Sequence, residues 1–177
     1  MMWQRRLMNE INRNWFWDQQ RQLYIANDYP DMTMTTYGCP WDPARCGPRQ
    51  LPIGETNKLS FIINLNNNRR CKIQMYFKPL DYPFRPPKVF IGDGENKLYK
   101  SSIGLQERWL KLVGSEECPC CTSIVCSANW YSVYQITDIL KEVQKNFSIR
   151  SRIRNILLCK QLINQKFGYY LPVEEFL

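Results

Sequence analysis

Histidine is absent from this chain, and no long apolar segment occurs anywhere in it. Without an imidazole, any zinc site would have to use cysteine as its main ligand. No window approaches the about 18 uncharged apolar residues of a transmembrane helix, so we expect no membrane span. Arg5, Arg6 and Glu10 interrupt the N-terminal region before an apolar core develops, and we therefore expect no secretory signal. Internal repeats and long linkers are also lacking, which favours a single domain over residues 1–177.

Negative charge is scarce beside positive charge, since 16 acidic residues face 24 basic residues and the formal net charge is +8. Such a charge permits an acidic partner, such as RNA, an anionic membrane or an acidic protein face. A nucleic-acid interface is expected to gather its basic side chains on one face. Eight of the arginines fall in four separate places, namely Arg5, Arg6, Arg13, Arg69, Arg70, Arg150, Arg152 and Arg154. We therefore expect a solvated surface and no nucleic-acid partner.

Eight cysteines occur without a signal peptide, which favours a reducing, intracellular (cytoplasmic) location. Four of them lie within nine positions, namely Cys118, Cys120, Cys121 and Cys126. Four thiols can supply a tetrahedral zinc site, but the spacing Cys-x-Cys-Cys-x4-Cys is not that of a standard zinc knuckle. We therefore expect no stoichiometric zinc and no cofactor. Three alternatives stay open for the cluster: small buried apolar side chains, a zinc site or disulfide, and a catalytic thiol.

Alternating apolar and polar residues predict a β-hairpin in the middle of the chain. Residues 59–65 and 71–77 both alternate, and Asn66-Asn67-Asn68 between them is typical of a turn. A short strand at 89–91 is expected to pair next. Further expected elements upstream are short strands at 22–26 and 32–37 and an irregular, Pro- and Gly-rich segment at 38–57.

Helical periodicity predicts helices towards both ends of the chain. The first is expected over 2–15, ending its apolar stripe at Trp15. Ser132 and Gln135 have the spacing of a capping box, which predicts a helix with one apolar face after them. A last helix is expected over 149–167, and a small helix around Trp109. A helix, a meander of about four strands, an irregular middle and C-terminal helices together indicate an α+β domain.

Two motifs carry a resemblance to a known family. The segment from Tyr82 to Val89 reads Tyr-Pro-Phe-Arg-Pro-Pro-Lys-Val, and it resembles the Tyr-Pro-Phe-x-Pro-Pro-x-Val signature of ubiquitin-conjugating enzymes. The segment from Trp130 to Ile136 is similar to the Trp-Ser-Pro-x-x-Thr-Ile sequence that opens the central helix of that family. The resemblance covers about residues 1–148, and residues 149–177 diverge from it. It implies the fold of ubiquitin-conjugating enzymes, with a four-stranded antiparallel meander packed on helices.

The resemblance also implies a catalytic cysteine and an upstream His-Pro-Asn motif, whose Asn supports the oxyanion. Lys100-Ser101-Ser102 stands where that motif belongs, so Ser102 replaces the Asn. The family's cysteine precedes the matching Trp by about eight residues, and Cys121 lies one residue off that position. Glu116 and Glu117 would disfavour a thiolate there. Cys121 and Ser102 are thus the candidate catalytic residues of a chain that looks most like a catalytically inactive ubiquitin-conjugating enzyme variant.

These observations favour a non-catalytic module that binds ubiquitin or another protein partner. One alternative is a structural component of a larger assembly, such as a viral particle, that reuses the fold. Another is an active ubiquitin-conjugating enzyme with Cys121 as its nucleophile. Aromatic side chains dominate protein interfaces, so Trp41 and Trp109 are the candidate partner-binding residues.

Overall fold

The computed structural model of the chain describes residues 2–18, 23–35, 58–65, 69–78, 81–92, 97–114 and 117–168. Its strands are β1 (Trp15–Asp18), β2 (Leu23–Ala26), β3 (Tyr29–Thr35), β4 (Lys58–Leu65), β5 (Arg69–Tyr76), β6 (Lys88–Ile91) and β7 (Lys97–Leu98). Its helices are α1 (Met2–Asn14), α3 (Tyr99–Ser102), α4 (Glu107–Leu112), α5 (Pro119–Thr122) and α6 (Ile136–Phe167). The mixture of an antiparallel sheet with helices confirms the α+β class.

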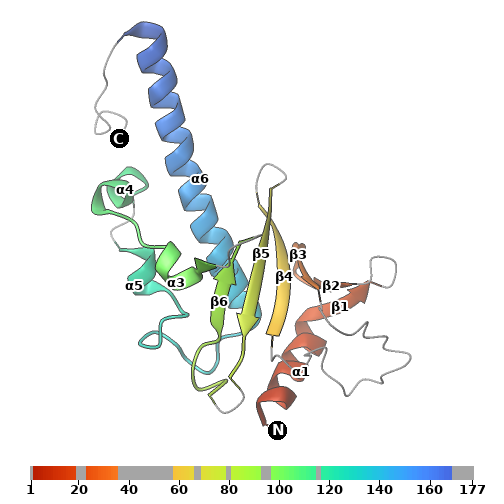
Figure 1. Cartoon of the computed structure of the whole chain (residues 1–177). Helices are drawn as coiled ribbons and strands as arrows, with labels where there is room; N and C mark the ends of the chain where they lie inside the picture. Colours follow the sequence, from red (N-terminus) through yellow and green to blue (C-terminus); the bar gives the residue numbers. More distant parts are fainter. Residues whose placement is uncertain are drawn as a thin grey trace.

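The strands form one antiparallel sheet in which the spatial order follows the sequence order from β1 to β7 (Figure 1). The predicted hairpin is confirmed, because Phe61 of β4 lies opposite Ile73 of β5. Ile73 in turn lies opposite Ile91, so the expected strand at 89–91 is also confirmed as the next neighbour. The expectation of four strands is wrong, since the described residues form seven. The two strands that match no expected range, β1 and β7, have only four and two residues, too few to show alternation.

The core lies between the sheet and two helices. Odd-numbered residues of β4 and β5 point to one face, where Phe61, Ile73 and Met75 are fully buried. The N-terminal half of α6 covers that face with Ile139 and Leu140, among others. Figure 1 shows α6 starting against the sheet and continuing well past its edge. The C-terminal half of α6 accordingly exposes large apolar side chains, namely Leu158, Leu162 and Phe167.

Helix α6 is one helix of 32 residues, whereas the sequence predicted two helices. No proline or glycine lies between residues 136 and 167, so nothing in the backbone chemistry ends the helix at the predicted boundary. The predicted capping box is also displaced by one turn. Gln135 is the N-cap, and its backbone N–H donates to Asp138 Oδ2 at 2.9 Å. Gly168 ends the helix in the left-handed conformation, with φ of 69°, that glycine adopts without strain.

Helix α1 holds the start of α6 in place. Glu10 Oε1 accepts a hydrogen bond from the N–H of Ile136, and Asn14 Nδ2 donates to Gln135 Oε1 at 2.9 Å. Leu7 and Ile11 from α1 are buried in the core. Trp15, predicted as the last helical residue, is buried beside Phe61 but belongs to β1. Leu7, Ile11 and Trp15 of the expected apolar stripe are thus buried, and α1 ends one residue before the predicted boundary.

Several sequence predictions fall outside the described residues. They are the irregular segment at 38–57 with Trp41, the Asn66-Asn67-Asn68 turn and the chain after Gly168. Within the part of the chain that the structure describes, no helix combines the length and the apolar character of a membrane span.

Candidate functional site

Ser102, the residue at the Asn-equivalent position, is the last residue of α3. Its hydroxyl donates to the carbonyl oxygen of Tyr99 at 2.8 Å, which is a bond within its own helical turn. Its own carbonyl oxygen accepts a hydrogen bond from Arg150 of α6. Ser102 therefore ties α3 to α6, and its hydroxyl hydrogen is already engaged. A donor that points into its own helix does not stabilise charge developing on a neighbouring thioester.

Cys121, the candidate nucleophile, is exposed on α5, a helix of four residues. Asn129 brings a side-chain amide beside it. That amide, however, donates to the backbone carbonyl oxygens of Cys121 at 2.6 Å and of Ser123 at 3.2 Å. Asn129 thus fixes the end of α5 and leaves no N–H for an oxyanion. No pattern in the sequence pointed to Asn129, because its role depends on the path of the loop from residue 123 to residue 129.

Three of the four clustered cysteines come together. The sulfur atoms of Cys118, Cys120 and Cys121 all lie within 4.8 Å of one another. The Cys118 and Cys120 sulfurs are 2.9 Å apart, and the hydrogen bond between them lowers the pKa of Cys118 to about 7. The same bond raises the pKa of Cys120 to about 11. Near neutral pH, Cys118 therefore has substantial thiolate character, a property that the sequence analysis had considered only for Cys121.

Cys126 lies apart from this group of three thiols. Its sulfur is 3.2 Å from the ammonium of Lys100, and its pKa is lowered by a backbone hydrogen bond from Ala128 and by Lys100. Among the described residues, the three thiols that remain together are one short of a four-thiolate zinc site. Two sulfurs bound to one zinc ion would also stand about 3.8 Å apart, given Zn–S distances of about 2.3 Å. Cys118 and Cys120 are closer than that, and the absence of stoichiometric zinc stays our prediction.

A carboxylate on α6 fixes the loop that follows the thiols. Glu142 accepts hydrogen bonds from the Tyr99 hydroxyl at 2.9 Å, the Ser123 hydroxyl at 2.6 Å and the backbone N–H of Ile124 at 2.7 Å. Asn146, one turn further along α6, donates to the same Tyr99 hydroxyl. This network joins α3, α6 and the loop, and so it positions both Ser102 and the thiols. The sequence analysis did not select Glu142, because an acidic residue next to the apolar face of a helix usually points into solvent.

The two family-like motifs meet in the structure. The indole N–H of Trp130 donates to the carbonyl oxygen of Pro83 at 2.8 Å, and this bond is buried. The rings of Tyr82, Trp130 and Tyr134 follow one another, with centroids 6.3 Å and 5.7 Å apart. On the outside of this core, three side chains are left largely in solvent, namely Phe84 (72% exposed), Tyr131 (63%) and Val133 (76%).

The predicted partner-binding tryptophans have different outcomes. Trp109 lies on α4, which confirms the expected small helix, and it is half-buried. The guanidinium of Arg108 lies 4.5 Å from the centre of the Trp109 ring, so part of the ring is covered by a neighbour. Trp41 falls outside the described residues. The structure therefore presents Phe84, Tyr131 and Val133, and not the tryptophans, as its most exposed apolar side chains near the motifs.

We predict that Cys121 forms no thioester with ubiquitin, because neither Ser102 nor Asn129 has a hydrogen-bond donor free for the oxyanion. The measurement is incubation with activating enzyme, ATP and ubiquitin, followed by a non-reducing gel. Variants Cys121→Ser and Cys118→Ser serve as controls. A reductant-sensitive adduct that disappears in either variant would show that the chain is catalytic and would identify the thiol.

Comparisons of this chain with protein-family models, with curated proteins and with solved structures each found no match.

Proposed function

We propose that this chain is a non-catalytic module of the ubiquitin-conjugating type that works by binding a protein partner. The observation that carries the proposal is the exposed apolar surface of Phe84, Tyr131 and Val133, which we call the loop surface. Single exposed apolar residues are common on soluble proteins. Three such side chains on two adjoining loops are less common, and a gathering of exposed apolar side chains favours an interaction site.

The loop surface stands on a rigid support. Phe84 follows Pro83, and Tyr131 follows Trp130, so the buried Trp130–Pro83 hydrogen bond holds the two loops together. Arg6 of α1 adds a third element, because its guanidinium donates to the Tyr134 carbonyl oxygen at 3.2 Å. A surface that is ordered before binding loses less conformational entropy when a partner docks. Large aromatic side chains on such a support are typical of interface hot spots.

The candidate catalytic residues support a non-catalytic role. The Ser102 hydroxyl is engaged by Tyr99, and the Asn129 amide is engaged by two backbone carbonyls. The motifs that resemble the family are instead those that build the core and carry the loop surface, around Tyr82 and Trp130. This division fits a protein that keeps the shape of a conjugating enzyme without its chemistry. Ubiquitin is one partner to test.

The alternative of an assembly component has its own support. The C-terminal half of α6 extends beyond the sheet (Figure 1) and exposes Leu158, Leu162 and Phe167. A projecting helix with exposed apolar side chains suits repeated contacts between the subunits of a particle, including a viral particle. Binding of a protein partner would thus use the loop surface, and assembly into a particle would use the C-terminal half of α6. Variants of each surface distinguish the two functions.

The experiment is co-purification of partners from the cells that make the protein, together with a titration against ubiquitin. The double variant Phe84→Ser/Val133→Ser should lose its partner, because each hot-spot side chain contributes about 2 kcal/mol, or roughly 30-fold in affinity. The control Leu158→Ser/Leu162→Ser removes two exposed apolar side chains from α6 and should retain the partner. The reverse pattern would favour the assembly function, and no loss in either variant would contradict both.

A further inference from the structure

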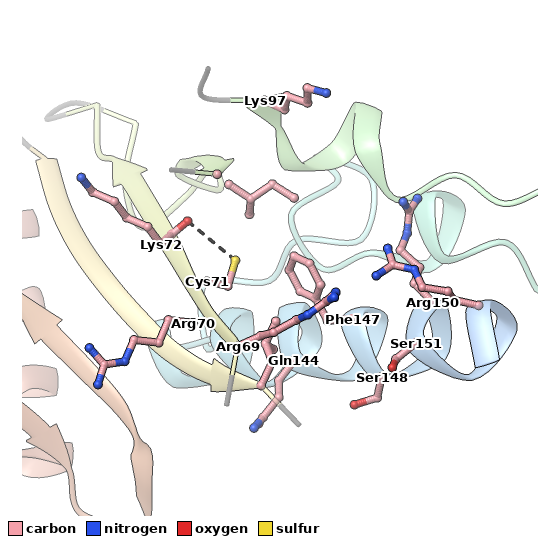
Figure 2. A pocket seen from close by; sticks show the side chains of 14 residues that line it. Arg69, Arg70, Cys71, Lys72, Lys97, Gln144, Phe147, Ser148, Arg150 and Ser151 are labelled. Atoms are coloured by element: carbon pink, nitrogen blue, oxygen red, sulfur yellow. Dashed lines mark hydrogen bonds between the residues drawn. The ribbon is translucent and has the colours of Figure 1, made fainter. Parts of the chain in front are cut away.

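A pocket of about 470 Å³ opens between the sheet and α6, and no step of the proposed function uses it. It is bordered by the N-terminal end of β5, by β6, by the start of β7 and by one face of α6 from residue 144 to residue 154 (Figure 2). Its size lies within the range of about 300–1,000 Å³ that is usual for sites that hold small molecules. The pocket is formed by other elements than the loop surface.

The fold brings arginines that are far apart in the sequence to this one pocket. Arg69 comes from β5, whereas Arg150 and Arg154 lie one turn apart on α6, and Lys97 adds a fourth cation from β7. The sequence analysis placed these arginines in separate groups and expected a solvated surface. All three arginines are exposed, as expected. The pairing of β5 with the sheet and the crossing of α6 nevertheless bring them to one pocket.

Strand alternation selects which basic residues of β5 face the pocket. Arg69 and Cys71 share the face of the buried Ile73, so they point towards α6. Figure 2 shows Arg69 and Arg150 beside Phe147, whereas Arg70 and Lys72 extend away from Phe147 on the other side of β5. The cations that line the pocket near Phe147 and α6 are therefore Arg69, Arg150 and Arg154, and Lys97 lies at its rim.

These cations lack a protein counter-charge within the described ranges. No carboxylate among the described residues lines the pocket. The ion pairs between described residues involve Asp81, Glu107 and Asp138, and none includes the four cations. Arg150 donates to the carbonyl oxygens of Ser102 and Gly104, which fixes its guanidinium without neutralising it. Guanidinium groups gathered in a hollow favour phosphate, which they bind through paired hydrogen bonds.

The pocket also has an apolar wall. Phe147 is half-buried, packs against the core and lines the pocket together with Ile91 and Leu65. An aromatic ring of this kind offers a face on which a planar base stacks. Serines at positions 148 and 151 add hydroxyl groups to the rim. A ligand that fits both the basic side and the apolar wall of the pocket carries several phosphates and a planar ring.

We propose that this pocket binds a nucleoside polyphosphate, with its phosphates on Arg69, Arg150 and Arg154 and its base against Phe147. Lys97, at the rim, adds a further positive charge. A volume of about 470 Å³ is usual for a site that holds one small molecule, so the proposal is for a free nucleotide and not for a segment of RNA. Binding at this site would stabilise the junction of β5 with α6, since the ligand contacts both elements.

The test is calorimetric titration of the full chain with ATP, with GTP and with inorganic tripolyphosphate, at low and moderate salt. We expect ATP and GTP to bind, and tripolyphosphate to bind at least about fivefold more weakly because it lacks a base. The variants Arg69→Gln and Arg154→Gln should each weaken ATP binding about tenfold. Both arginines are exposed, so these variants should fold, which a thermal melt confirms.

Two further variants sharpen the result. Arg152→Gln removes an exposed arginine of the same helix that does not line the pocket, and it should bind ATP like the wild type. Phe147→Leu should weaken ATP binding about fivefold and leave tripolyphosphate binding unchanged. The proposal is overturned by the absence of nucleotide binding, by equal binding of tripolyphosphate and ATP, or by an equal effect of Arg152→Gln and Arg154→Gln. Tight binding of single-stranded RNA without binding of free nucleotides would also overturn it.

Discussion

Replacing Glu142 with alanine is expected to lower the free energy of unfolding by about 3–5 kcal/mol. The Glu142 carboxylate accepts hydrogen bonds from the Tyr99 hydroxyl, the Ser123 hydroxyl and the Ile124 N–H. Hydrogen bonds to a charged acceptor contribute about 1.5–3 kcal/mol each, and water replaces part of that at a half-buried site. Tyr99 is buried, so its hydroxyl would keep only the contact with Asn146. Chemical unfolding measured by circular dichroism gives the difference.

Two control variants test whether the network causes the loss. Glu142→Gln retains an acceptor oxygen without the charge, and we expect about half the effect of Glu142→Ala. Lys145→Ala changes an exposed residue of the same helix and should stay within about 0.5 kcal/mol of the wild type. A loss below about 1 kcal/mol for Glu142→Ala would mean that the loop from residue 123 is held mainly by other contacts. The hydrogen bonds to Glu142 would then contribute little to the stability of the fold.

The sheet could be predicted where side-chain alternation was long enough to read. Residues 59–65 and 71–77 alternate over seven positions each, and their register in the structure follows that pattern. Strand β7 has two residues, so it carries no period that a sequence could reveal. Trp15 fits a helical stripe and a strand equally well, because it lies at the junction where the chain passes from α1 into β1. The residue pattern along the sequence was enough to predict the long strands, whereas the short strands form through tertiary contacts that the pattern does not show.

The candidate sites were less predictable than the fold, since each depends on contacts between distant parts of the chain. The thiols of Cys118, Cys120 and Cys121 are the exception, since they are close in sequence as well as in space. The link from Glu142 to Ile124 crosses between a helix and a loop, and no spacing rule describes it. The basic pocket needs Arg69 and Arg154 on facing elements. Charge counted along the sequence cannot detect such a convergence.

Replacing Glu10 with glutamine is expected to stabilise the protein by about 3 kcal/mol at pH 8 and by very little at pH 4.5. Burial raises the pKa of Glu10 from 4.5 to about 7, although the Ile136 N–H and Arg6 act in the opposite direction. Between pH 4.5 and about pH 7, the Glu10 carboxyl keeps its proton in the folded protein and loses it in the unfolded chain. The free energy of unfolding must therefore fall as pH rises through this window, by up to about 1.4 kcal/mol per pH unit.

Glutamine removes the charge but keeps a side-chain oxygen that can accept the hydrogen bond from Ile136 at the start of α6. Urea unfolding of both proteins from pH 4.5 to pH 8.5 gives the difference curve, from which groups that titrate alike in both proteins cancel. The chain has no histidine, so no imidazole complicates this window. Glu107→Gln, at an exposed residue paired with Lys111, is the matched control and should change the free energy of unfolding by less than about 1 kcal/mol. Parallel curves for the wild type and Glu10→Gln would show that the buried carboxyl stays ionised, with Arg6 and the amide of Ile136 fully offsetting its burial.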